Sequence, residues 1–194
     1  MIKIDQKILD LIREEHLKNY SIRESSIYVN EHFNEDLIIA EVGSRSGINA
    51  KTILLSMKVE KLYLIDPYTP YLDGGTFLTQ EDQDAYYVEM YNNMKQFLDR
   101  VIFITRPSIL ASKLFEDEYF DYIYLDANHN YESVMTDQKS WFPKVKKGGF
   151  ISGHDIGYPD VIKAVNDFIE GYNYHQHTNI KPMLFTGDWL YKKE

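Results

Sequence analysis

Short apolar runs alternate with amphipathic segments over most of the chain, and this alternation is its strongest pattern. The apolar runs have the length of strands and lie at residues 37–42, 61–65, 101–104, 120–125 and 150–152. The segments between and after them have the character of helices and lie at residues 48–57, 81–98, 108–115, 131–142 and 161–169. This repeated strand–helix order predicts an α/β fold, a largely parallel sheet with helices on both faces.

Two further helices are predicted before the first strand, at residues 5–19 and 24–33. The apolar residues of the first share one helical face: Ile4, Ile8, Leu11 and Ile12. We expect residues 1–35 to form a helical preface, a lid on one side of the sheet, to a core of residues 36–194. Neither a repeat nor a linker interrupts the chain, so one domain over residues 1–194 is predicted.

The remaining segments are shorter and less regular. The last helix is expected to close at Gly171, and two final strands are predicted at residues 172–178 and 188–191. Residues 67–80 hold two prolines and a Gly74–Gly75 pair, which predicts a long loop. Loops of this length are often functional or mobile, and a plain excursion explains this one equally well.

Composition narrows the range of partners. The chain has 194 residues, 44% of them hydrophobic, which suits one domain with a sizeable core. Its 30 acidic and 21 basic residues give a net charge of −9, which argues against nucleic acid or an anionic membrane as the main partner. No cysteine is present, which excludes disulfides and thiolate catalysis. Since no apolar leader or membrane-length apolar run is found either, we expect a cytoplasmic protein.

A glycine-containing turn, from Glu41 to Gly47, joins the first apolar run to the helix after it. Gly43 permits a positive φ and a close approach of the backbone to a ligand, and Gly47 lets the helix start tightly against the strand. The free N–H groups at the helix start favour a polar or anionic group. Glu41 is unusual at a strand end, because a carboxylate there is costly unless something pairs with it. An ordinary strand-to-helix connection also explains the two glycines.

Residues with polar or charged side chains, together with the turn glycine Gly43, follow five successive apolar runs, at the edge where a parallel sheet collects its ligands. They are Glu41, Gly43, Asp66, Ser108, Asp126, His129, His154 and Asp155. Asp66 lies about 20 residues after Gly43, the spacing of a ribose-binding acid in nucleotide sites, although it can also cap the turn before Pro67. Two carboxylates facing one cleft, Asp126 and Asp155, can hold a divalent cation such as Mg²⁺. An imidazole on the same loop, His129, can act as a general base toward a hydroxyl.

These motifs resemble those of the class I S-adenosylmethionine-dependent methyltransferases. Residues 41–47 look like the first motif of that family and residues 64–67 look like the second. Residues 120–131 and 148–155 are similar to a small bacterial branch related to the metal-dependent O-methyltransferases of natural-product and sugar pathways. The resemblance covers residues 37–170. It implies a Rossmann-like fold with seven strands, the last one antiparallel, and S-adenosylmethionine as cofactor.

The resemblance also implies a role for individual residues. The cofactor would be surrounded by Glu41, Gly43, Ser44, Gly47, Asp66, Ser108 and Asp126, with Asp66 on the ribose hydroxyls and Ser108 near the adenine. Asp126 and Asp155 match the metal-binding acids, and His129 falls where related enzymes place the catalytic base, with His154 as the next candidate. Ile156 stands where a further polar ligand often follows, so a metal is implied less strongly than the cofactor.

The predicted function is methyl transfer from S-adenosylmethionine to a hydroxyl of a small acceptor, a sugar or natural product. An NAD(P)-dependent oxidoreductase is an alternative, because Tyr91-x-x-x-Lys95 imitates the catalytic pair of short-chain dehydrogenases. That pair comes too early in the chain, and Tyr91 falls on an expected apolar helix face with Tyr87, Met94 and Leu98. A non-catalytic nucleotide-binding protein of the same fold and an oxygenase-like relative also stay open. The sequence indicates neither the acceptor nor the oligomeric state.

Overall fold

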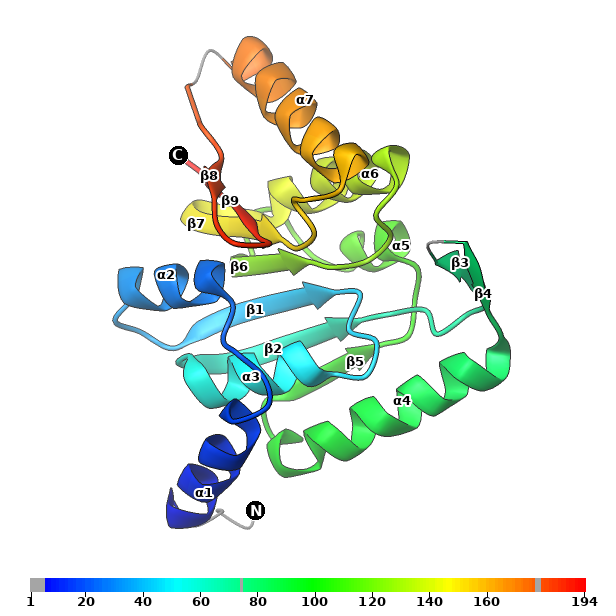
Figure 1. Cartoon of the computed structure of the whole chain (residues 1–194). Coiled ribbons are helices and arrows are strands. Elements are labelled where there is room, and N and C mark those ends of the chain that lie inside the picture. The colour runs from blue at the N-terminus through cyan, green and yellow to red at the C-terminus, as the bar shows by residue number, and fades with distance from the viewer. Residues whose placement is uncertain (1–5, 74, 177–178) are drawn as a thin grey trace.

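The predicted apolar runs form strands in a computed structural model that describes residues 6–73, 75–176 and 179–194 (Figure 1). The strands are β1 (Leu37–Val42), β2 (Val59–Ile65), β3 (Tyr71–Asp73), β4 (Thr76–Leu78), β5 (Val101–Ile104), β6 (Phe120–Leu125), β7 (Val145–Gly153), β8 (Met183–Leu184) and β9 (Trp189–Lys192). The helices are α1 (Gln6–Leu17), α2 (Glu24–His32), α3 (Ile48–Ser56), α4 (Gln80–Met94), α5 (Ser108–Ser112), α6 (Tyr131–Trp141) and α7 (Pro159–Gln176), with 3₁₀ turns η1 (Lys95–Phe97) and η2 (Phe142–Lys144).

Seven of the strands form one sheet, in the order β5-β2-β1-β6-β7-β9-β8. Strands β5, β2, β1, β6 and β7 run parallel, and β9 runs antiparallel to both of its neighbours. The register aligns the carboxyl ends of the central strands, because Val42 pairs with Ile65 on one side and Leu125 on the other. The predicted Rossmann-like, mostly parallel sheet with an antiparallel last strand is therefore confirmed.

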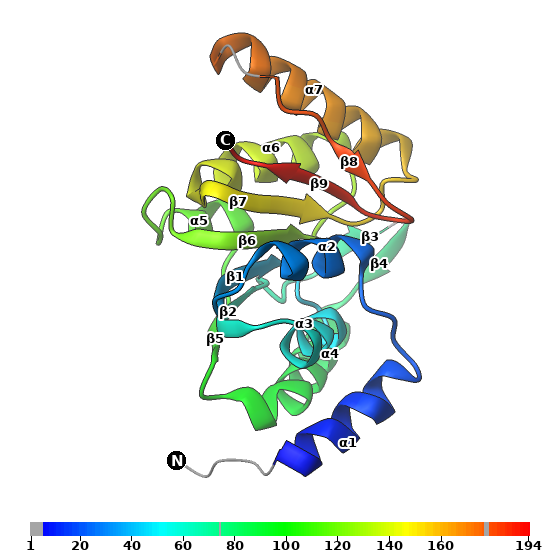
Figure 2. The same cartoon turned by 90° about the vertical axis from the view of Figure 1, so that its left-hand side faces the viewer.

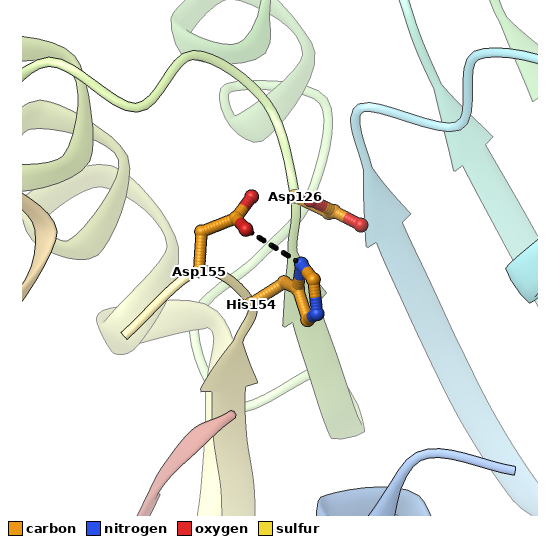
Figure 3. A group of neighbouring side chains, drawn as sticks. All are labelled: Asp126, His154 and Asp155. Carbon is orange, nitrogen blue, oxygen red and sulfur yellow. Dashed lines mark ion pairs between the residues drawn. The ribbon is translucent and has the colours of Figure 1, made fainter. Parts of the chain in front are cut away.

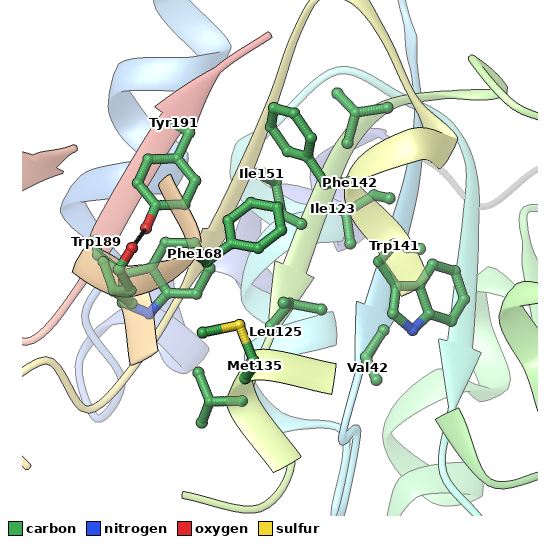
Figure 4. Close-up of a cluster of buried hydrophobic side chains, with 14 of the residues drawn as sticks. Val42, Ile123, Leu125, Met135, Trp141, Phe142, Ile151, Phe168, Trp189 and Tyr191 are labelled. Atoms are coloured by element: carbon green, nitrogen blue, oxygen red, sulfur yellow. Dashed lines mark hydrogen bonds between the residues drawn. The ribbon is translucent and has the colours of Figure 1, made fainter. Parts of the chain in front are cut away.

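Helices cover both faces of the sheet, and each face has its own apolar core (Figures 1 and 2). Helices α5, α6 and α7 pack on one face, around Trp141, Phe168 and Trp189 (Figure 4). Helices α2, α3 and α4 pack on the other face, with Val29 and Met94 fully buried. Burial of a large apolar side chain contributes about 1.5–3 kcal/mol, so these two cores hold the strand ends in place.

The carboxyl-terminal region departs from the prediction. Helix α7 continues past Gly171 to Gln176, so the strand predicted at residues 172–178 is wrong for its described part; residues 177 and 178 lie outside the described residues. The reason is packing: Tyr172 lies 4.7 Å from the ring of Phe142, which extends the buried face of the helix by another turn. In chain order, the sixth strand of the large sheet is instead the short β8.

The predicted loop at residues 67–80 contains the antiparallel hairpin β3–β4, which projects beyond the sheet (Figure 1). Helix α1 does not lie on the sheet as a lid. It contacts α3, where His16 Nε2 lies 2.8 Å from Thr52 Oγ1, and Leu11 is 65% exposed. Ile4 of the predicted helical face lies outside the described residues. Only α2 of the two N-terminal helices therefore covers the sheet.

The buried face of α4 also differs from the predicted one. Met90 and Met94 are buried, whereas Tyr87, Tyr91 and Leu98 are exposed. Met94 is buried as predicted, but the expected place of Tyr91 on the buried face is wrong, because α4 turns Met90 and Met94 toward the sheet. Among the described residues, no helix combines the length and the apolar character that crossing a membrane requires.

Candidate active site

A cavity of about 970 Å³ lies at the carboxyl ends of β1, β2, β6 and β7. It forms there because parallel strands end together and the following loops turn away to the two helical layers. Nine of the ten predicted site residues line it: Glu41, Gly43, Ser44, Asp66, Ser108, Asp126, His129, His154 and Asp155. The tenth, Gly47, is not among its lining residues. Helices α4 and α6 and the residue before α2, Arg23, complete the wall.

Glu41 at the end of β1 is 1% exposed and incompletely paired. Asn49 Nδ2 donates a hydrogen bond of 2.8 Å to Oε1, but the buried Oε2 has no partner among the described residues. Burial raises the pKa of Glu41 to about 8, and the Asn49 hydrogen bond opposes this only in part. The side chain therefore presents an unsatisfied polar atom at the cavity, where a ligand donor would complete it.

The two glycines of the turn have structural reasons for their identity. Gly43 has φ 91°, and a Cβ there would lie 2.2 Å from the carbonyl oxygen of Asp126. Its close approach is therefore to the backbone after β6, and not only to a ligand. Gly47 has φ 73° and contacts Met90 of α4, which explains why it supports helix packing without lining the cavity.

Asp66 links the turn after β2 to the glycine-containing turn after β1 through hydrogen bonds of its carboxylate. Its Oδ2 accepts a hydrogen bond from the backbone N–H of Arg45 and its Oδ1 accepts one from that of Tyr68, both at 2.9 Å. Burial raises the pKa of Asp66 above its usual value, and these two hydrogen bonds oppose the rise. The Tyr68 hydroxyl in turn donates to the carbonyl of Arg45 at 2.8 Å, so the two turns form one rigid wall.

Ser108 is the first residue of α5, and its hydroxyl is engaged away from the helix start. Its Oγ donates to Asp137 Oδ1 and accepts from Trp141 Nε1 at 2.8 Å. Burial raises the pKa of Asp137 to about 6. Asp137 lines the cavity, yet the sequence did not indicate it, because an acid inside an amphipathic helix such as α6 normally faces solvent.

His129 lies between the two predicted metal acids. Its Nε2 is 2.8 Å from Asp155 Oδ2 and 3.7 Å from Asp126 Oδ1, although neither contact has the alignment of a hydrogen bond. The two carboxylates raise the pKa of His129 to about 10. In turn, the contact with His129 holds the pKa of Asp155 well below its usual range. Both acids therefore favour the imidazolium form of His129 in this arrangement, whereas a general base has to be neutral. The role of His129 as base stays a prediction.

His154 directly follows β7 and lies beside Asp155 (Figure 3). On its other side it contacts Arg23. Its Nδ1 is 3.1 Å from Asp155 Oδ1, and its Nε2 is 2.7 Å from Arg23 Nη1. Asp155 raises the pKa of His154, but a guanidinium can only donate, so Nε2 must carry a lone pair. We therefore assign a neutral ring with its proton on Nδ1, directed at Asp155.

The tautomer of His154 decides how many ligands remain for a divalent cation. Asp126, His154 and Asp155 each offer a donor atom within 4.8 Å of the others, close enough for one ion. A neutral imidazole has one lone pair, and Arg23 occupies that of His154, so two carboxylates remain in this arrangement. Two protein ligands do not complete a site, and we derive no step through a metal. The metal on Asp126 and Asp155 stays a prediction.

The sequence did not indicate Arg23, because it belongs to the connection before α2, far from every strand end. The pair that suggested a dehydrogenase, Tyr91 and Lys95, is absent from the lining of the cavity.

The comparisons with known proteins agree with this geometry. The model of a family described as a methyltransferase domain matches residues 40–156. No curated protein sequence matches the chain. Among solved structures, the chain resembles an O-methyltransferase from Bacillus cereus in complex with SAH, at 12% identity and a TM-score of 0.59, covering 100% of this chain and 93% of that one.

An rRNA methylase from Streptococcus thermophilus is also similar, at 12% identity and a TM-score of 0.62, over 91% of this chain and 98% of that one. At such identities these structures show a shared fold. The matched family, in contrast, spans more than half of the chain, from β1 to just beyond β7. The chain therefore belongs to the methyltransferase-domain family, and the predicted class I S-adenosylmethionine-dependent methyltransferase is confirmed.

Proposed function

We propose that the chain transfers the methyl group of S-adenosylmethionine to a hydroxyl oxygen of a small acceptor, such as a sugar or a phenolic natural product. The unpaired, buried Oε2 of Glu41, on the wall that also carries Asp66, is the observation that supports this most directly. The cofactor carries an ammonium group and a ribose diol, both hydrogen-bond donors. The ammonium would complete Glu41, and the diol would use lone pairs that Asp66 retains beside its backbone hydrogen bonds.

The acids around His129 supply the other requirement of the reaction, a place for the acceptor's proton. The sulfonium already activates the methyl group, so the protein must align the attacking oxygen and remove its proton. Asp126 is the less engaged of the two acids, since its contact with His129 is the longer one. The acceptor oxygen would give its proton to Asp126 as it bonds the methyl carbon and the carbon–sulfur bond breaks. The His129 imidazolium would stabilise the negative charge that develops on the oxygen.

Small acceptors fit the chain better than RNA does, although a solved neighbour is described as an rRNA methylase. A net charge of −9 opposes binding to a polyanion, which depends on basic side chains. A cavity of about 970 Å³ is of the size that small-molecule sites have.

Calorimetry with S-adenosylmethionine, SAH and NAD offered separately tests the cofactor. We expect binding of the first two and none of NAD; binding of NAD alone would contradict the proposal. Transfer of labelled methyl to a panel of hydroxyl compounds, with and without EDTA, tests the reaction.

With an acceptor in hand, His129→Ala is expected to lower turnover by about 10²–10³-fold, because it removes the charge that stabilises the developing oxyanion, while SAH affinity is retained. His175→Ala, an exposed histidine of α7, is the matched control and should retain full activity. Full activity of His129→Ala would remove this residue from the mechanism, and loss of activity in EDTA would show that a metal takes part.

A further inference from the structure

Arg23 brings a positive charge into the acidic end of the cavity. Its side chain is partly buried, lines the cavity and approaches His154 at 2.7 Å. Within the part of the chain that the structure describes, no carboxylate lies within ion-pair distance of its guanidinium. The neighbouring acids are directed elsewhere, since Asp126 and Asp155 contact His129 and Asp155 also contacts His154. Arg23 therefore forms no ion pair within the described residues, although its charge acts at longer range on Glu41.

The residues that follow Arg23 hold it in this position. Glu24 Oε2 accepts a hydrogen bond of 3.0 Å from the backbone N–H of Thr186. Ser25 Oγ donates at 2.6 Å to Asp188 Oδ2, and Asp188 is fully buried. These two hydrogen bonds attach the start of α2 to Thr186 and Asp188, just before β9, the strand that pairs with β7. These contacts hold the backbone next to Arg23 in place, so that its side chain starts from a fixed position beside the cavity.

Most of the N–H donors of Arg23 have no protein acceptor among the described residues. A guanidinium has five N–H donors, and a single one is used, toward His154, among the contacts within the described residues. The planar fork of arginine matches a carboxylate or a phosphate in a bidentate geometry. The imidazole ring of His154 separates Arg23 from Asp155, and Asp155 in turn contacts His129, which the proposed reaction places beside the reacting oxygen. A group bound by Arg23 would therefore lie in the same part of the cavity as the reacting hydroxyl.

We propose that the acceptor of the methyl group carries an anionic substituent, a carboxylate or a phosphate, and that Arg23 binds it. The inference rests on the proposed methyl transfer, because it places the acceptor at this end of the cavity. The positive sulfonium of the cofactor would add to the attraction of an anionic acceptor. Arg23 thus selects a hydroxy acid or a phosphorylated hydroxyl compound over its neutral counterpart.

Matched pairs of probes test the proposal on the complex of the full chain with SAH. The carboxylate pair is 3,4-dihydroxybenzoate and catechol, and the phosphate pair is glucose 6-phosphate and glucose. Ligand-observed NMR titrations would measure the affinity of each. We expect the anionic member of at least one pair to bind about 10-fold or more tightly than its neutral partner, and the pair that shows the difference identifies the anionic group.

Arg23→Gln should abolish this preference and leave SAH affinity unchanged, whereas Arg23→Lys should retain part of it. Arg106→Gln, an exposed arginine outside the cavity lining, is the matched control and should behave as the wild type. A wild type that favours neither anionic probe would overturn the inference, as would an Arg23→Gln variant that keeps the preference. Failure of the wild type to bind SAH would instead refute the proposed function itself.

Discussion

Glu41 is buried without a full set of partners, which makes the stability of the protein depend on its charge state. Its pKa is raised to about 8 in the fold, above the value of 4.5 for a solvated glutamate. As pH rises from about 4.5 to 8, the unfolded chain gives up this proton before the folded chain does. The folded state is therefore progressively disfavoured over this window, and the contribution is absent below it.

Glu41→Gln should remove this dependence, because the amide stays neutral. The free energy of unfolding of the variant, measured in urea without cofactor, should exceed that of the wild type by on the order of 2–4 kcal/mol at pH 8 and match it near pH 4. Glu35→Gln, on an exposed glutamate, provides the control. Parallel stability curves for Glu41→Gln and the wild type would show that Glu41 is not buried as a neutral acid.

Asp66 offers the clearest test of cofactor recognition by one residue. Asp66→Ala should weaken SAH binding by about 1.5–3 kcal/mol, because it removes the carboxylate that would accept hydrogen bonds from the ribose hydroxyls. Calorimetry measures the change, and Asp99→Ala, an exposed aspartate after η1, should leave the affinity unaltered. An unchanged affinity in Asp66→Ala would place the ribose elsewhere.

The buried hydrogen bonds under α2 connect an N-terminal element to the carboxyl-terminal strands. Asp188 accepts from Ser25 Oγ at 2.6 Å and from the Tyr124 hydroxyl at 3.1 Å. Tyr122 adds a hydrogen bond of 2.6 Å to Ser152 Oγ in the same buried layer. Helix α2 is therefore held by these polar contacts in addition to its apolar ones, which include the fully buried Val29 and the ring contact of Tyr28 with Phe150.

Ser25→Ala should lower the free energy of unfolding by about 1–3 kcal/mol, because Asp188 loses a donor that water cannot replace. Hydrogen exchange should become faster in α2 than in α6, which locates the effect. Ser21→Ala, on an exposed serine just before Arg23, should change neither measurement. Equal exchange in α2 for wild type and Ser25→Ala would show that α2 is held by other contacts.

At the scale of the whole molecule, the cavity exists only when the ends of separate strands meet. A ligand of the cavity therefore binds the folded state alone and stabilises it by mass action. SAH at 100 times its Kd should stabilise the fold by about 2.7 kcal/mol, which corresponds to a rise in Tm of roughly 5–10 °C for a chain of this length. Thermal denaturation at several SAH concentrations measures this, and a Tm independent of SAH would contradict binding at the strand ends.

The sequence by itself determined the fold class and most of the cavity wall. Strand β1, β5 and β6 have the predicted bounds, because an apolar run and its flanking turn are local features. Polar residues at successive strand ends, such as Glu41 and Asp66, share one cavity because parallel strands with short connections must end at the same edge. The methyltransferase family was inferred from the resemblance of residues 41–47 and 64–67 to the motifs of that family.

Only the tertiary structure decided the charges inside the cavity and the elements at its margins. Arg23 and His154 are 131 residues apart in sequence, and no local pattern signals that a guanidinium will meet that imidazole. His129 becomes an imidazolium because the fold places it between Asp126 and Asp155, and α7 extends past Gly171 because Phe142 offers Tyr172 a surface to pack against. Local propensity reflects the chain's neighbours in sequence, whereas pKa, tautomer and helix length here depend on neighbours that only folding supplies.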